Sequence, residues 1–142
     1  MMFKPMAAIA LLAGLAGCAL GIDGGSAPRA TFQANMPVQD ALNAAQEQAT
    51  LCLRGKDAYE VVRLPGGNAD SGSVVVRAPF TQNDIARVDV AGAGAGRSNV
   101  DIVMWGRSLW DANAVSAMRD AITFRTPSCK AYMPRQAPAA PK

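Results

Sequence analysis

The chain has no histidine and only three cysteines, and charged side chains make up just 18% of its 142 residues. The absence of histidine removes the commonest general base of enzymes and the commonest neutral metal ligand. The 14 Lys and Arg residues outnumber the 11 Asp and Glu residues by little and are scattered, so no nucleic-acid-binding surface is predicted. The length fits one average domain, and the 50% share of hydrophobic residues excludes an intrinsically disordered chain.

A continuous apolar run, MAAIALLAGL, covers residues 6–15 close to the N-terminus. A run of about ten residues has the length of the hydrophobic region of a signal peptide, whereas a membrane-spanning helix needs about 20. The run follows a short segment that contains one basic residue, Lys4, and it ends at Leu15-Ala16-Gly17-Cys18. The sequence therefore predicts an export signal rather than a membrane-spanning helix.

The tetrapeptide Leu15-Ala16-Gly17-Cys18 resembles the lipobox of bacterial lipoproteins. This resemblance implies a diacylglyceryl group on the sulfur of Cys18, cleavage before Cys18 and usually N-acylation of the new terminus. Two or three acyl chains hold a protein stably on a membrane. Residue 19 is Ala instead of the Asp that favours inner-membrane retention in enterobacteria, so the resemblance implies an outer-membrane lipoprotein that faces the periplasm. The inner membrane, the cell surface and an ordinary secretory leader stay open as alternatives.

The two other cysteines predict a disulfide bond. Lipidation of Cys18 would leave Cys52 and Cys129 in an oxidising compartment. One bond between them closes a long loop, which the chain-entropy model values at about 4 kcal/mol. A metal site is the weaker interpretation because the chain has no histidine and no third free cysteine, and a catalytic thiol would lack its usual histidine base. No metal and no cofactor are therefore predicted.

Four segments are predicted along the chain. They are the signal peptide at 1–17, which is removed, the lipidated N-terminus and flexible tether at 18–36, a single domain at 37–133 and a disordered Pro/Ala-rich tail at 134–142. The tether is assigned because Gly, Ala, Ser and Pro dominate its first part. The chain is expected to contact the membrane through the lipid on Cys18.

The domain is predicted to be an α+β two-layer sandwich. Apolar residues at helical spacing predict a helix from Pro37 to Arg54, and a second helix after a capping box at Ser108-Leu109-Trp110-Asp111. Alternating runs between turn residues predict four strands, at 58–64, 73–79, 85–91 and 99–106. Short loops favour an antiparallel meander with both helices on one face. The Gly-rich segment at 92–97 is predicted as a hairpin loop, not a phosphate-binding loop, because the segment after it alternates like a strand.

The functional hypothesis concerns the face of the sheet opposite the helices. The alternation directs nine side chains inward: Val74, Val76, Ala78, Ala86, Val88, Val90, Val100, Ile102 and Met104. It directs Val75, Arg77, Arg87, Asp89, Asp101, Val103 and Trp105 outward, whereas Trp110 is predicted to lie in the core. Apolar and aromatic groups among charges that can pair across strands are typical of a protein-interaction surface, although strand propensity alone would also explain them.

These observations predict a lipid-anchored, non-catalytic, periplasm-facing protein that docks on another envelope protein. The alternative is a small-ligand or cell-wall binding module that uses the cleft between the helices and the Gly92–Gly96 loop. An enzyme of unrecognised type is the third hypothesis, because carboxylates are present but no nucleophile motif or metal-ligand spacing accompanies them. A homo-oligomer stays open, and no nucleic-acid partner is expected.

Overall fold

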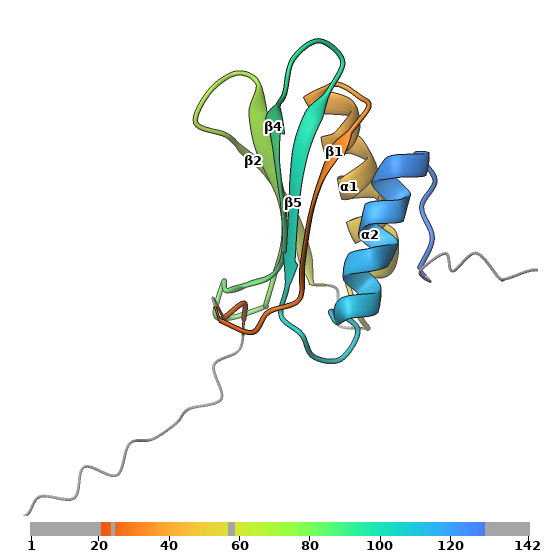
Figure 1. The fold of residues 1–142 in the computed structure, drawn as a ribbon. Helices are drawn as coiled ribbons and strands as arrows, with labels where there is room; N and C mark the ends of the chain where they lie inside the picture. The colour runs from red at the N-terminus through yellow and green to blue at the C-terminus, as the bar shows by residue number, and fades with distance from the viewer. Residues whose placement is uncertain (1–20, 24, 57–58, 130–142) are drawn as a thin grey trace, which may run out of the picture.

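A computed structural model of the chain describes residues 21–23, 25–56 and 59–129 (Figure 1). The signal peptide, Cys18 and the tail at 134–142 lie outside the described residues, so the predictions about them stay predictions. A five-stranded antiparallel sheet packs against two helices, and both helices cover the same face (Figure 1). The α+β class and the helix-on-sheet arrangement are confirmed.

The elements follow in the order β1 (Arg29–Ala34), α1 (Val38–Cys52), β2 (Glu60–Pro65), β3 (Ser71–Arg77), β4 (Asp84–Gly92), β5 (Ser98–Met104) and α2 (Ala112–Phe124). The strands lie in the order β1-β5-β4-β3-β2, and every neighbouring pair is antiparallel. Strands β2 to β5 therefore form the predicted meander. Strand β1 lies next to β5, at the edge that the prediction left open.

Strand β1 shows that the predicted tether at 18–36 and the predicted domain start at residue 37 are wrong. It pairs with β5 along its whole length. Ala34 is buried, and Ala30 and Phe32 pack against the core, so the segment alternates like a strand with one covered face. The sheet has five strands instead of four, and the folded domain includes at least residues 29–34.

The hydrophobic core lies between the sheet and the helices. All nine side chains that were predicted to point inward are buried and belong to this core. The two helices contribute the faces that helical spacing predicts, namely Val38, Leu42, Ala45, Ala49 and Leu53 from the first helical segment and Val115, Met118 and Ile122 from α2. The predicted register of β3, β4 and β5 relative to the core is therefore confirmed.

Helix α2 begins differently from its prediction. Asp111 is the N-cap, and its side chain accepts a hydrogen bond from the backbone N–H of Ala114 at 3.0 Å. Ser108 lies in the preceding turn with a left-handed φ of 55°, so it cannot cap the helix as the capping-box prediction required. Trp110 is buried as predicted, and its indole Nε1 donates to the carbonyl oxygen of Leu53 at 3.0 Å.

Two contacts fasten the segment after α2 to α1. Cys52 and Cys129 form a disulfide, with their Cα atoms 5.1 Å apart, which confirms the predicted pairing. The buried side chain of Gln48 donates from Nε2 to the carbonyl oxygen of Ser128 at 2.6 Å and accepts from the Ser128 N–H at 2.8 Å. One amide side chain thus satisfies both backbone groups of Ser128, as a neighbouring strand would.

Candidate functional site: the outer face of the sheet

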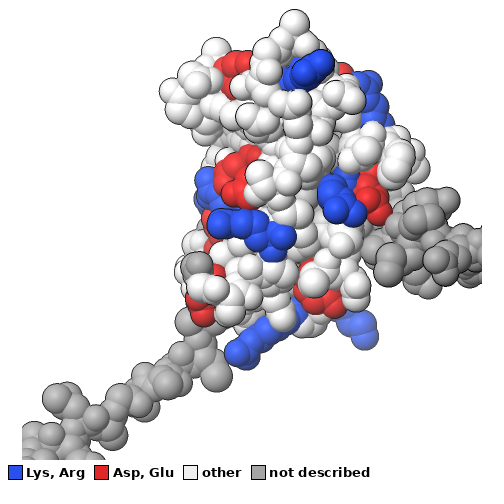
Figure 2. Space-filling model, in the orientation of Figure 1, with Lys and Arg blue, Asp and Glu red and all other residues white. Residues whose placement is uncertain are grey.

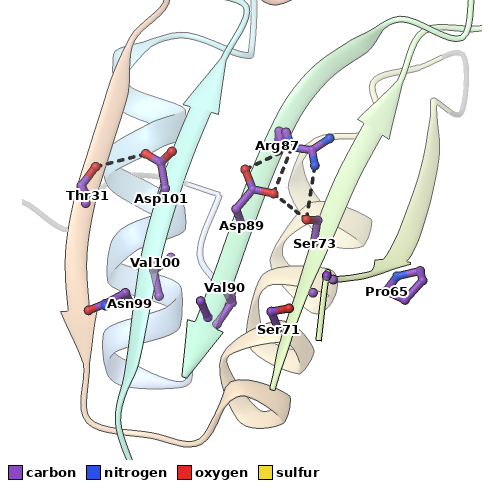
Figure 3. Close-up of a pocket in the computed structure, with 14 residues that line it drawn as sticks. Thr31, Pro65, Ser71, Ser73, Arg87, Asp89, Val90, Asn99, Val100 and Asp101 are labelled. Atoms are coloured by element: carbon purple, nitrogen blue, oxygen red, sulfur yellow. Dashed lines mark hydrogen bonds and ion pairs between the residues drawn. The ribbon is translucent and has the colours of Figure 1, made fainter. Parts of the chain in front are cut away.

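The candidate site is the side of the sheet that the helices leave uncovered, which we call the outer face. A shallow depression of about 460 Å³ lies on it, across β1, β5, β4 and β3 and beside the β2–β3 turn. Glycines and apolar residues make up half of its lining. The other half carries polar side chains, which Figure 3 shows on the same side of the sheet: Thr31, Ser71, Ser73, Arg87, Asp89, Asn99 and Asp101. Each of these side chains comes from a strand, so the rigid sheet sets their relative positions.

The register of the strands arranges the outer face in rows. One row runs through Leu64, Ser73, Asp89, Asp101 and Thr31, which are successive cross-strand partners, and it is polar from Ser73 onward. The adjacent row runs through Val62, Val75, Arg87, Val103 and Arg29. The carboxylates of Asp89 and Asp101 therefore lie beside a row in which Arg87 stands between Val75 and Val103.

Arg87 organises the charges on β3 and β4. Its Nε donates to both carboxylate oxygens of Asp89, at 2.9 and 3.1 Å, and its Nη1 donates to Asp84 at 3.1 Å. Ser73 also donates to Asp89, at 2.5 Å (Figure 3). Arg77 lies 3.5 Å from Asp84. The hydrogen bond to Asp89 is the main reason that the pKa of Arg87 is raised above its ordinary value, although partial burial acts in the opposite direction.

Asp101 forms a second charged group on β5 and β1. It lies directly opposite Asp89 in the register, a placement that is unfavourable for two carboxylates. Arg29 lies 3.5 Å from Asp101, and the Thr31 hydroxyl donates to Asp101 at 3.1 Å. The charged residues of the outer face do pair, but not across strands with one another as predicted. Arg87 and Asp89 pair within β4, Arg77 pairs with Asp84, and Asp101 pairs with Arg29 of β1.

Val75 and Val103 do not form the exposed apolar surface that the sequence predicted. Their side chains point to the outer face, but only 0% and 6% of their surface is exposed. Arg87 is a cross-strand neighbour of both valines, and the aliphatic stem of an arginine can cover apolar neighbours while its guanidinium stays in water. Neither valine offers a partner a large apolar contact.

Trp105 does not lie on the outer face either. Strand β5 ends at Met104, so the alternation on which its placement depended stops one residue earlier. Trp105 packs against the core, with its ring centroid 6.3 Å from that of Trp110, and the guanidinium of Arg107 lies 5.8 Å over its ring. The outer face therefore keeps its charged and hydroxyl side chains but loses the aromatic group that made it resemble an interaction surface.

The two edges of the sheet differ in a way that the sequence reasoning missed. At the β2 edge, Arg63 donates to Asn43 at 2.7 Å and to Gln39 at 2.6 Å on α1, and Pro65 ends the strand. A charged side chain directed to the helix layer and a proline both discourage a further strand from pairing. Strand β1 has neither feature, and no described strand covers its outer edge. The alternation of Ala30, Phe32 and Ala34 was the signal that could have revealed this strand.

The Gly-rich segment forms the loop of the β4–β5 hairpin, as predicted. The N–H of Ala93 donates to the carbonyl oxygen of Arg97 at 3.0 Å, and Gly94 and Gly96 have φ values of 106° and 66° that favour glycine. Strand β5 follows directly, so the loop does not lead into a helix N-terminus that could bind phosphate.

No protein-family model matches the chain, and comparison with curated proteins gives no match. Within residues 21–23, 25–56 and 59–129, no three His, Cys, Asp or Glu side chains are grouped so that they could hold a metal ion. No helix in this part of the chain is long and apolar enough to cross a membrane. Three features bear on function: the resemblance of Leu15-Ala16-Gly17-Cys18 to a lipobox, the outer face and the edge of β1.

Proposed function

We propose that the protein is a lipid-anchored, non-catalytic domain that faces the periplasm and docks on another envelope protein. Docking would use the free edge of β1 together with the adjoining part of the outer face. The observation that carries this proposal is the free edge itself, a regular strand whose outward backbone N–H and C=O groups pair with no other strand among the described residues. Such an edge is a template for one more strand from a partner chain.

The composition of this surface favours hydrogen bonding over charge attraction. Arg29, Thr31 and Gln33 are exposed along β1, and Gln33 donates to Asn99 of β5 at 3.4 Å. The outer-face carboxylates are already paired with arginines, and Figure 2 shows both signs interspersed without a large field of one sign. We therefore expect an extended, polar partner segment and little dependence of binding on salt.

The resemblance of residues 15–18 to a lipobox supports the anchor, and the position of the start of the described chain supports a role for it in docking. The N–H of Ile22 donates to the carbonyl oxygen of Asp84 at 3.0 Å, so the chain joins the domain only a few residues after Cys18. An acyl anchor at Cys18 would therefore hold β1 and the outer face close to the membrane. Such confinement raises the effective concentration of the domain for partners in the same membrane, which we propose is the outer membrane.

A small-ligand or cell-wall binding module is the alternative. The observation that favours it is the depression on the outer face, where hydroxyl, amide and carboxylate groups lie beside apolar surface, a combination that suits a sugar-like ligand. A ligand in that depression would contact Ser73, Asp89 and Asn99 and would leave the edge of β1 free.

Site-specific photo-crosslinking in living cells tests the proposal. A photoreactive residue at Thr31, exposed on β1, is compared with the same residue at Thr50, exposed on α1. We expect a discrete protein adduct from position 31 and none from position 50, because only position 31 adjoins the free edge. The absence of a protein adduct at 31, or the same adducts at both positions, would contradict docking at β1. A glycan adduct at 31 without protein would support the cell-wall binding module instead.

A further inference from the structure

One end of the molecule gathers the start of the described chain and three loops. The N–H of Ile22 donates a hydrogen bond to the carbonyl oxygen of Asp84, next to the β3–β4 loop, and Gly21 lies beside Asn83 in that loop. Pro28 lies against Gly106 in the β5–α2 loop. Figure 1 shows these segments together with the α1–β2 connection at one end of the sheet, and the β2–β3 and β4–β5 hairpin turns at the other. We call the first of these the anchor end, because Cys18 precedes Gly21 by only three residues.

Phe80, in the β3–β4 loop, is the most exposed large apolar residue of the described chain. Its side chain is 100% exposed, and its φ of 70° lies in the left-handed region, where Gly or Asn is favoured over a bulky residue. Neither burial nor backbone preference accounts for a phenylalanine at this turn. A contact with something outside the described part of the chain would account for it.

Other side chains of the anchor end fit the same explanation. Leu109 in the β5–α2 loop is 37% exposed, and its side chain approaches Gly55 of the α1–β2 connection. Exposed cations accompany these apolar groups: Arg54, Lys56 and Arg107. Aromatic and aliphatic groups set among Lys and Arg are typical of surfaces that lie in the headgroup region of a membrane.

We propose that the anchor end rests on the phospholipid surface, with Phe80 inserted beside the acyl chains of Cys18. This inference rests on the proposed lipid anchor. The three residue steps from Cys18 to Gly21 span at most about 11 Å, so an anchored chain holds this end at the membrane. A lone ring at a loop tip also suits lipid better than protein, because protein hot spots are clustered and surrounded by neighbouring contacts.

Two contacts with the membrane would fix the orientation of the domain. The strands would stand on the membrane, the two hairpin turns would point away from it, and the edge of β1 would face sideways toward other membrane proteins. The segments of this end also carry acidic residues, namely Asp23, Glu60, Asp84 and Asp111. Insertion of apolar groups, not charge, would then hold the end down, and anionic lipid is expected to change the contact little.

Photo-crosslinking in vesicles tests this orientation. The full lipidated chain is purified from membranes and placed in vesicles of phosphatidylethanolamine, with or without phosphatidylglycerol. Photoreactive benzoylphenylalanine replaces Phe80 or, as the matched control, Phe124, which is 63% exposed at the far end of α2. Intact mass after irradiation shows which position has gained a phospholipid.

We expect a phospholipid adduct at position 80 in both vesicle types and none at position 124. Equal labelling at both positions, no labelling at 80, or an adduct of 80 with a second copy of the chain would overturn the inference. The same spectrum reports the acyl chains on Cys18. Their absence would refute the proposed anchor itself, whereas their presence without an adduct at 80 would refute only the orientation.

Discussion

The attachment of the segment after α2 to α1 gives a quantitative prediction about the disulfide and Gln48. The disulfide joins residues that are 77 positions apart, and the chain-entropy model gives about 4.5 kcal/mol for a loop of that size. Gln48 adds two hydrogen bonds to Ser128, each worth about 1 kcal/mol. Both contacts act on the same short segment, so their contributions to the free energy of unfolding should depend on each other.

The hydrogen bonds alone are too weak to hold this segment. Ordering a residue costs about 1–2 kcal/mol of backbone entropy, so residues 127–129 cost about 3–6 kcal/mol, against about 2 kcal/mol from the two bonds. We expect Gln48→Met to destabilise the oxidised protein by about 2 kcal/mol. In the Cys52→Ser/Cys129→Ser background, the same substitution should cost almost nothing, because the segment has already detached.

Denaturant unfolding of the four proteins measures this coupling. All four proteins are produced without residues 1–17 and with the substitution Cys18→Ser, so that no acyl chain interferes with unfolding. Gln46→Met on α1 is the control, since Gln46 accepts only one long hydrogen bond of 3.4 Å from Arg63, and its effect should be the same with and without the disulfide. If Gln48→Met lowers the free energy of unfolding equally with and without the disulfide, the hydrogen bonds of Gln48 do not depend on the disulfide, and the predicted coupling is refuted.

Three further predictions concern the sheet. Trp105→Ala should destabilise the protein by about 2 kcal/mol and leave the crosslinks from position 31 unchanged, because Trp105 packs against the core; retained thermal stability with lost crosslinks would place it in an interface instead. Phe32→Ser should release β1 and speed hydrogen exchange in β5, whereas Thr31→Ser should not; equal exchange in both variants would contradict the packing of β1. Arg87→Met should lower the free energy of unfolding by at most about 1 kcal/mol, and by less at high salt, because salt screens the ion pair with Asp89. Denaturant unfolding at low and high salt measures this, and a loss that does not depend on salt would contradict an ionic role for Arg87.

The sequence predicts the meander well because its strands are adjacent in the chain and alternate clearly. The same pattern yields all nine inward residues, since the covered face of a sheet follows directly from a period of two. Strand β1 escapes the prediction for a physical reason: it is short, it follows a Gly- and Ser-rich segment, and its partner β5 lies about 70 residues further along the chain. Local patterns do not reveal such a distant pairing.

The candidate site shows a second limit of sequence reasoning. Alternation correctly directs Val75 and Val103 to the outer face, but the exposure of each valine depends on the side chains beside it. The strand register places Arg87 next to both valines, and the sequence of one strand alone does not reveal that register. Trp105 illustrates the importance of strand ends, because one residue beyond β5 the direction of the side chain no longer follows the alternation. The disulfide was predictable because the resemblance of residues 15–18 to a lipobox assigns Cys18 to lipidation and leaves only two other cysteines.

The lipid anchor on Cys18 is the central proposal. Processing of the chain in bacterial cells that are fed labelled palmitate tests this anchor most directly. The wild type is compared with Cys18→Ala. We predict that the wild type carries the label and loses residues 1–17, whereas the variant stays unlabelled and keeps its leader. A variant that is labelled or cleaved like the wild type, or a wild type without label, would contradict the lipoprotein assignment and the membrane orientation built on it.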